Sequence, residues 1–181
     1  MRLHQFITES THRLEQDRFQ HLLTPAVRAL DKAAQDAGFE VRIVGGAVRD
    51  LVMGNDPKDI DMATDAHPEE MMAVLDAVGI RHEPTGLQHG TITAILDSEP
   101  IEITTLRVDV ETDGRHAEVE FTNDWRKDAE RRDLTFNAMS MSMDGMLYDY
   151  FDGVEDLAAG RARFVGCLLY TSPSPRDLST S

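Results

Sequence analysis

Residues 44–50 read Val44-Gly45-Gly46-Ala47-Val48-Arg49-Asp50, and residues 59–61, nine positions further on, read Asp59-Ile60-Asp61. Two adjacent glycines leave backbone N–H groups open to an anion, because no Cβ blocks a close approach. A helix that begins at this turn would add a favourable dipole for a phosphate. Arg49, one turn into that helix, could then place its guanidinium on two phosphate oxygens. The first stretch therefore predicts a phosphate-binding turn.

The aspartates of the second stretch predict a site for a divalent cation. The run from Lys58 to Met62 has the pattern of a strand, in which residues two apart point to the same face. Asp59 and Asp61 would then share one face of the sheet. Two adjacent carboxylates repel each other, and a bound divalent cation is the usual reason why a protein tolerates this repulsion. A phosphate-binding turn beside such a pair is typical of nucleotide chemistry.

Composition describes an ordinary globular chain. Its 181 residues are enough for one core, and 41% hydrophobic with 28% charged residues fits a folded rather than a disordered protein. No apolar run approaches the roughly 20 residues of a membrane helix, and the first residues lack the apolar segment of a secretory signal. The single Cys167 cannot form an internal disulfide, which suits a reducing compartment. We therefore expect a cytoplasmic protein without membrane contact, and the sequence predicts no stable protein partner.

The net charge of −15 argues against a simple nucleic-acid-binding module, which normally has a basic surface. A local positive pocket inside an acidic shell remains compatible with this charge. Much of any contact with a long polyanion would then lie in other parts of a protein.

The order of expected elements predicts an α+β fold, with helices packed on a mixed β-sheet. Apolar periodicity, together with Thr24-Pro25 as a helix start and Gly38 and Gly79 as helix ends, marks the helices. Residues 108–124, with alternating acids, are expected to form a mobile loop. The expected helices span 11–22, 25–37, 47–53, 68–78 and 124–137, and the expected strands span 40–44, 58–62, 91–96, 101–107, 138–143 and 146–149.

These features together resemble the head of the tRNA nucleotidyltransferase and poly(A) polymerase family, which includes the class II CCA-adding enzymes. The resemblance covers about residues 23–166. A lone glycine pair or Asp-x-Asp is weak evidence, but several blocks in the family's order are strong evidence. The matching blocks are Gly45–Asp50, Lys58–Thr64, His89–Thr91, Glu102–Arg107, Arg131–Met139 and Asp149–Gly153.

The resemblance implies a nucleotidyltransferase-type mixed sheet and a reaction assisted by two Mg²⁺ ions. Asp59 and Asp61 are the expected catalytic metal ligands, since ionised carboxylates suit hard Mg²⁺. Glu102 is a candidate third catalytic carboxylate, because its strand is expected beside that of the two aspartates. A register slip of one residue would turn Glu102 to the other face, so its orientation stays open at this point.

Nucleotide binding is expected at two of the blocks. Gly45, Gly46 and Arg49 would hold the triphosphate, as the family uses this turn in that way. Arg132, preferred over its neighbour Arg131, together with Asp133 and Asn137 resembles the family block that contacts triphosphate and ribose. We expect these last three on one face of the predicted helix over 124–137.

The activity implied by the resemblance is transfer of nucleotides from CTP and ATP to the 3′ end of tRNA without a template, which is CCA addition. Poly(A) polymerases of this family tend to carry a basic Gly-Arg-Arg/Lys-Phe run after the helix that follows the metal strand. Residues 85–91 read Thr-Gly-Leu-Gln-His-Gly-Thr instead, which resembles the CCA-adding branch. Polyadenylation is the alternative.

The ends of the chain fall outside the resemblance. Residues 1–22 are expected to form an N-terminal docking helix or extension, and residues 167–181 an unrelated or disordered tail rich in Ser, Thr and Pro. The family's base-selecting Glu-Asp-x-x-Arg block, which belongs to the neck that follows the head, is not found. A second hypothesis is therefore an inactive fragment that binds nucleotide and Mg²⁺.

Overall fold

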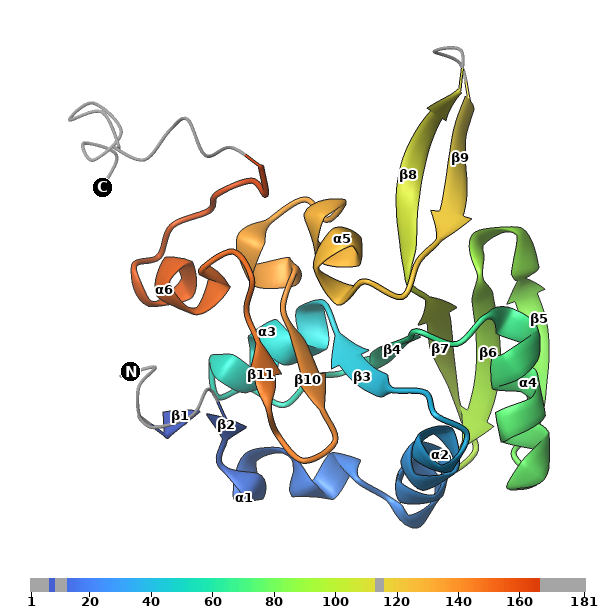
Figure 1. The fold of residues 1–181 in the computed structure, drawn as a ribbon. Coiled ribbons are helices and arrows are strands. Elements are labelled where there is room, and N and C mark those ends of the chain that lie inside the picture. The colour runs from blue at the N-terminus through green and yellow to red at the C-terminus, as the bar shows by residue number, and fades with distance from the viewer. Residues whose placement is uncertain (1–6, 9–12, 113–115, 167–181) are drawn as a thin grey trace.

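The computed structural model describes residues 7–8, 13–112 and 116–166. Its central feature is a seven-stranded sheet in the order β11-β10-β3-β4-β7-β6-β5, with two small two-stranded sheets, β1-β2 and β8-β9 (Figure 1). The helices and strands are β1 (Ile7–Thr8), β2 (Arg13–Leu14), α1 (Gln16–Phe19), η2 (Gln20–Leu22), α2 (Pro25–Asp36), β3 (Val41–Val44), α3 (Gly46–Val52), β4 (Asp61–Thr64), α4 (Pro68–Ala77), β5 (His82–Gly86), η3 (Leu87–His89), β6 (Thr91–Leu96), β7 (Glu99–Thr105), β8 (Arg107–Thr112), β9 (His116–Phe121), α5 (Trp125–Glu130), η4 (Thr135–Asn137), β10 (Ser140–Ser142), β11 (Leu147–Tyr148) and α6 (Gly153–Ala158).

The sheet is mixed, as predicted. β4 and β7 run parallel, whereas the other neighbouring strands of this sheet pair antiparallel. A parallel pair needs a long crossover connection, and the segment with α4, β5 and β6 supplies it between β4 and β7. The α+β class is therefore confirmed.

One face of the sheet forms the main core. A row of apolar side chains crosses five neighbouring strands in register, and each is at most 1% exposed. Buried side chains of α2 and α4 belong to the same cluster, so these two helices cover this face. Full burial of one such side chain stabilises the fold by about 1.5–3 kcal/mol. The row consists of Met141, Ile43, Met62, Ile103 and Ile92.

The opposite face is more polar. Because side chains alternate along a strand, Asp61 points to this face while Met62 enters the core. A small apolar cluster of Val44, Ala63 and Leu106 lies here against the half-buried Trp125. This face carries the candidate site.

A buried arginine attaches α5 to the polar face. The Arg42 guanidinium lies between the rings of Trp125 and Tyr148, 3.9 and 3.5 Å from their centroids. It also donates two hydrogen bonds to Glu40, of 2.7 and 2.9 Å. Burial alone would lower the pKa of Arg42, but hydrogen bonds to Glu40 and Tyr150 raise it above its ordinary value. Arg42 therefore stays charged and keeps Trp125 of α5 in place.

The helix starts and ends at α2 and α4 follow local signals. The Thr24 side chain accepts the Val27 N–H at the start of α2, and Gly38 follows that helix with a φ of +87°.

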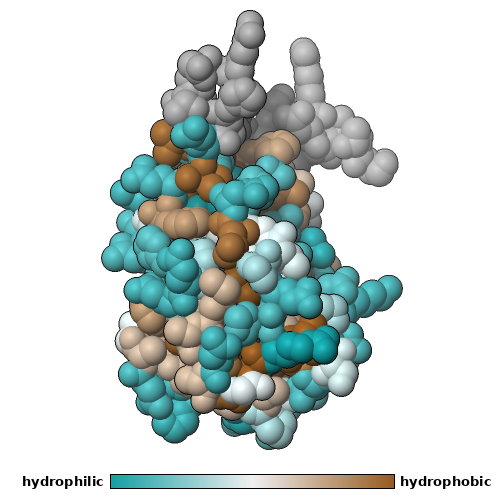
Figure 2. All heavy atoms as spheres, turned by 90° about the vertical axis from the view of Figure 1, so that its right-hand side faces the viewer, coloured by the Kyte–Doolittle hydropathy of each residue, from teal (hydrophilic) through white to brown (hydrophobic). Residues whose placement is uncertain are grey.

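Most of the surface over α4 and the β5 edge is hydrophilic (Figure 2). Within the described residues, every helix is too short or too polar for a membrane span.

Several predicted boundaries were wrong. The N-terminal helix expected over 11–22 is only α1 followed by the single turn η2. β4 begins at Asp61 rather than at Lys58, so Asp59 precedes the strand. β3, the strand that pairs with the start of β4, ends at Val44 opposite Asp61. The chain then turns into α3, so β3 does not extend alongside the residues before Asp61.

Residues 108–124 form a hairpin rather than a loop. β8 and β9 pair over six residues and project from the body of the molecule (Figure 1). Valines at every second position of β8 and within β9 favour strands, which the acids between them obscured in the sequence. The hairpin's tip, residues 113–115, and the predicted tail, residues 167–181, lie outside the described residues.

The helix predicted over 124–137 is also shorter. α5 ends at Glu130, and Leu134 is extended and forms a bridge with Phe164. The N–H of Thr135 donates to the carbonyl of Arg163, 3.0 Å away. Pairing with a distant segment thus replaces helix continuation after α5.

Asp156 in α6 holds the end of the described chain together. It is fully buried and accepts hydrogen bonds from Arg161 Nε at 2.8 Å and Arg163 Nε at 3.0 Å, and another from Thr135. Burial alone would raise the pKa of this carboxyl, but the hydrogen bonds outweigh burial and hold the pKa below its ordinary value. The ionised form therefore stabilises the fold.

We predict that Asp156→Asn lowers the free energy of unfolding by about 3 kcal/mol at neutral pH, because it leaves partly buried arginines without their partner. A depressed folded-state pKa contributes stability that is present above the unfolded pKa and is lost as pH falls below about 4. Urea unfolding of both proteins between pH 3 and pH 7 should therefore show their difference shrinking at the acid end.

Glu155→Gln is the control, because Glu155 is the exposed neighbour of Asp156 in the same helix. It should change the free energy of unfolding by less than about 0.5 kcal/mol. Equal effects of the two substitutions on the free energy of unfolding would contradict a stabilising role of the ionised Asp156 carboxylate. A difference between Asp156→Asn and the original chain that does not change with pH would contradict it as well.

Candidate active site

A cavity of about 410 Å³ opens where the glycine turn meets the start of β4, the segment after α5 and the end of η4. Its size falls in the range of small-molecule sites. Four separate parts of the chain contribute to it. The lining residues are Gly45, Gly46, Arg49, Asp61, Arg131, Arg132, Asp133 and Asn137.

The turn between β3 and α3 requires glycine. Gly45 has a φ of +71° and a ψ of −138°, a conformation that residues with a Cβ rarely adopt. The lack of side chains also lets two guanidiniums approach the backbone. A Cβ at Gly45 would lie 3.6 Å from Arg132 Nη1, and a Cβ at Gly46 would lie 3.3 Å from Arg49 Nη2. The turn and the two arginines thus form one wall of the cavity.

Arg49 is fixed by its neighbours while it remains partly open to solvent. Its Nη1 donates to Asn137 Oδ1 at 3.2 Å, and its Nε and Nη2 both donate to Asp50 Oδ1, at 3.2 and 3.1 Å. About a third of the Arg49 side chain is exposed. Because the Asn137 oxygen is occupied by Arg49, the amide N–H₂ of Asn137 is the group left to donate to a ligand.

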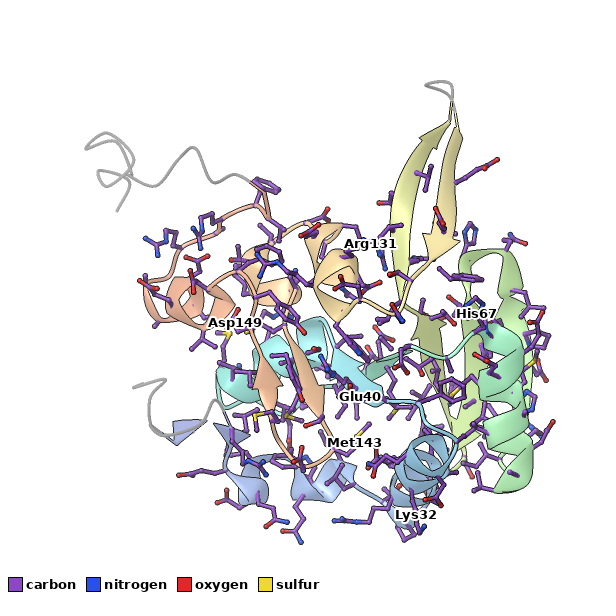
Figure 3. All side chains as sticks on the ribbon, in the orientation of Figure 1. Lys32, Glu40, His67, Arg131, Met143 and Asp149 are labelled. Carbon is purple, nitrogen blue, oxygen red and sulfur yellow. The ribbon has the colours of Figure 1, made fainter. Side chains whose placement is uncertain are left out.

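Arg131 and Arg132 share one buried carboxylate. Arg131 Nε donates to Asp128 Oδ1 at 3.2 Å, and Arg132 Nη2 donates to Asp128 Oδ2 at 3.4 Å. Asp128 lies in α5 and is 4% exposed. Arg131 is found beside α5 on the side of the hairpin β8-β9 (Figure 3). These contacts hold both guanidiniums at the cavity.

One of the three predicted catalytic acids lines the cavity, and the other two do not. Asp61 lines the cavity, whereas Asp59 and Glu102 are not among its lining residues. Glu102 is the register partner of Asp61 on the parallel strand β7, so both side chains leave the same face, about 5 Å apart at the backbone. All three carboxylates are exposed. Across the described residues, no three acidic, histidine or cysteine side chains gather closely enough to form a complete protein metal site.

All six predicted nucleotide-binding residues therefore line the cavity, although the expected helical face does not exist. Arg132 and Asp133 lie in the irregular segment after α5, and Asn137 ends η4. Asp128 was not among the predicted site residues, although its spacing of three and four residues from two arginines was a signal in the sequence.

The cavity combines three arginines with two carboxylates, those of Asp61 and Asp133. Counted over these lining residues alone, the wall has one more positive than negative charge, within a chain of net charge −15. An anion with several negative groups, together with a cation near Asp61, would satisfy these charges.

Comparisons with known proteins match this geometry. Residues 41–163 match the family model of the poly A polymerase head domain. CCA tRNA nucleotidyltransferase 1, mitochondrial, of Danio rerio is 55% identical over 157 residues, which are 86% of this chain and 36% of that protein. The CCA-adding enzyme of Bacillus licheniformis is 40% identical over 78% of this chain and 34% of its own length.

Solved structures are similar as well. A crystal structure of the Bacillus stearothermophilus CCA-adding enzyme in complex with CTP gives a TM-score of 0.69 at 32% identity, over 84% of this chain and 34% of that one. A tRNA nucleotidyltransferase complexed with a primer tRNA and an incoming ATP analog gives a TM-score of 0.54 at 27% identity, over 71% and 36%.

The chain spans about a third of the length of these curated relatives. The matching region contains the seven-stranded sheet from β3 onward and every residue that lines the cavity. Because the match of residues 41–163 covers more than half of the sequence, this chain belongs to the poly A polymerase head domain family.

Proposed function

We propose that residues 23–166 form the catalytic head of a tRNA nucleotidyltransferase that adds CCA to the 3′ end of tRNA from CTP and ATP. The observation that carries this proposal is the cavity in which Arg49, Arg131 and Arg132 face Asp61 beside a glycine turn. The names of the relatives support tRNA as the acceptor, and the titles of two similar structures name CTP, an ATP analog and a primer tRNA. A cytoplasmic location is part of the proposal, although the Danio rerio relative is named mitochondrial.

Different residues of the cavity would bind the triphosphate and the ribose. Arg132 lies beside Gly45 and Arg49 lies beside Gly46, so a triphosphate at this turn would meet two guanidiniums and bare backbone. The Asn137 amide is directed by its hydrogen bond to Arg49 and would donate to a ribose hydroxyl. Asp133, exposed at the cavity, would accept from a second hydroxyl. Together they hold the nucleotide for attack at its α-phosphate.

The acids fit a magnesium ion that is completed by substrate. Mg²⁺ prefers oxygen ligands and is usually held by one or two carboxylates together with waters and substrate phosphates. Asp61, with Asp59 two residues before it and Glu102 beside it on β7, offers such oxygens, and no closed protein cage is needed. When bound, Mg²⁺ would neutralise charge on the attacking and leaving oxygens.

Nucleotide transfer would form one bond and break one bond at the α-phosphorus. The 3′-hydroxyl oxygen of the RNA forms a bond to the α-phosphorus, and the bond from that phosphorus to the bridging oxygen of the β-phosphate breaks. Pyrophosphate leaves with the electron pair, and the hydroxyl proton passes to solvent. The chain's contribution is alignment of the triphosphate, since the arginines hold the two phosphates that become pyrophosphate.

Two measurements test the proposal together. Isothermal titration with CTP and Mg²⁺ should show binding to this chain, and extension of a tRNA lacking its CCA end should stop after three nucleotides. Long A tails on arbitrary RNA would favour polyadenylation instead. Absence of nucleotide binding would overturn the proposal.

We predict that Asp61→Asn lowers the rate of nucleotide transfer at least about 100-fold, because the cavity loses its lining carboxylate for Mg²⁺. In EDTA the same variant should bind CTP no more weakly than the original chain, since a negative charge beside the triphosphate is gone. Titration with and without Mg²⁺ separates these effects.

Glu99→Gln makes the same charge change on an exposed residue, the first of the neighbouring strand β7. It should leave both readouts unchanged. Equal Mg²⁺ stimulation of CTP binding in Asp61→Asn and the original chain would show that Asp61 is not a metal ligand.

We also predict that Gly46→Ala weakens CTP binding roughly tenfold, because the new Cβ, 3.3 Å from Arg49 Nη2, displaces that guanidinium. Gly46 begins α3 and has no positive φ, so the free energy of unfolding should change by less than about 1 kcal/mol. Gly86→Ala is the control, since its Cβ would meet only Thr91 at an ordinary 3.5 Å. Unchanged affinity in Gly46→Ala would argue against a role for Arg49.

A further inference from the structure

Asp128 joins three parts of the structure through one carboxylate. Its Oδ1 accepts the backbone N–H of Arg107 at 3.0 Å and Arg131 Nε at 3.2 Å, and its Oδ2 accepts Arg132 Nη2 at 3.4 Å. Arg107 is the first residue of β8, so the root of the hairpin is bound to the same acid as two cavity arginines. Asp128 itself is 4% exposed and does not line the cavity.

The chain of contacts continues from Asp128 to the glycine turn. Arg132 donates with Nη2 to Asp128, while its Nη1 lies 3.6 Å from the Cβ position of Gly45. One guanidinium therefore spans the distance between the buried acid and the backbone that faces the cavity. Its planar shape transmits a defined orientation from one end to the other.

The surroundings of Asp128 are crowded with positive charge. Burial lowers the pKa of the Arg107 guanidinium, and the neighbouring charge of Arg131 lowers it further, with a smaller effect from Arg132. Arg107 Nη1 donates to the carbonyl of His89 at 2.7 Å, while its buried Nε has no hydrogen-bond partner among the described residues. Three guanidiniums that repel one another lie around one carboxylate, so their arrangement depends on that carboxylate.

We propose that Asp128 is a positioning residue for the triphosphate. Asp128 acts through Arg131 and Arg132, because it holds both side chains at the cavity wall in the orientation that a bound nucleotide needs. This inference rests on the proposed function of the cavity. An arginine that is already held in place loses less side-chain entropy on binding than a free one does. Asp128 would thus increase affinity although it never contacts the nucleotide.

Two opposite effects make the inference testable. If Asp128 were only a counter-charge, Asp128→Asn would make the cavity more positive and anions would bind more tightly. If Asp128 positions the arginines, the same substitution would weaken binding despite the gain in positive charge. The sign of the change in affinity therefore separates the two roles.

The first experiment is titration of the full chain with CTP and with inorganic triphosphate, in the presence of Mg²⁺. Asp128→Asn should weaken binding of both ligands roughly tenfold, about the effect of one hydrogen bond to a charged group. Asp128→Glu, which restores the carboxylate, should recover part of the loss. Unchanged or tighter binding in Asp128→Asn would overturn the inference.

A double-mutant cycle supplies a readout that a purely structural role would not produce. If Asp128 acts through Arg132, Asp128→Asn should have little further effect on affinity in a chain that already carries Arg132→Gln. Additive effects of the two substitutions would overturn the inference. Each variant is first checked by thermal unfolding and titrated well below its midpoint.

Glu40→Gln is the matched control. Glu40 also holds an arginine, Arg42, on the polar face, and neither residue lines the cavity. The substitution should lower the unfolding midpoint without changing affinity for triphosphate. If the original chain binds no triphosphate, the proposed function fails, whereas binding that is insensitive to Asp128 rejects only the positioning role.

Discussion

The register between β3 and β4 is the constraint on which the site depends. Val44, the last residue of β3, pairs with Asp61, the first residue of β4. The chain leaves β3 directly into Gly45, so Asp61 must lie beside the turn that carries Arg49. A slip of one residue would bury the Asp61 carboxylate in the core and expose Met62, and both changes are unfavourable. The apolar row that stabilises the sheet therefore also positions the acid at the cavity.

The sequence predicted those parts of the fold that local chemistry determines. The strand expected over 91–96 matches β6, and Thr24 marked the start of a helix, because strand propensity and helix capping act between near neighbours. Boundaries that depend on a distant partner were missed. The start of β4 follows from the end of β3, and α5 ends early because Leu134 pairs with Phe164, 30 positions away. Neither partner can be identified from a short window of sequence.

The cavity also combines features that local sequence determines with features that depend on distant parts of the chain. The glycine turn and Arg49 could be predicted from one short block, because a positive φ and a close approach of backbone are local requirements. Arg132 and Asn137 were assigned to the site by resemblance, on a helical face that does not exist. They still meet because η4 packs against α3 and places Asn137 against Arg49. A resemblance can thus identify the residues of a site correctly while the local geometry that brings them together differs from expectation.

An acidic chain that binds a polyanion must separate its charges, and acids paired with arginines do so in this structure. Glu40 holds Arg42, and Asp156 holds Arg161 and Arg163, in each case away from the cavity. Asp128 differs because the arginines it holds are shared with the cavity wall. Asp128 carries one negative charge against the two positive charges of Arg131 and Arg132, and both of these guanidiniums line the cavity. A net charge of −15 and an anion-binding site are therefore compatible, since the guanidiniums next to a bound triphosphate act on it more strongly than distant surface acids do.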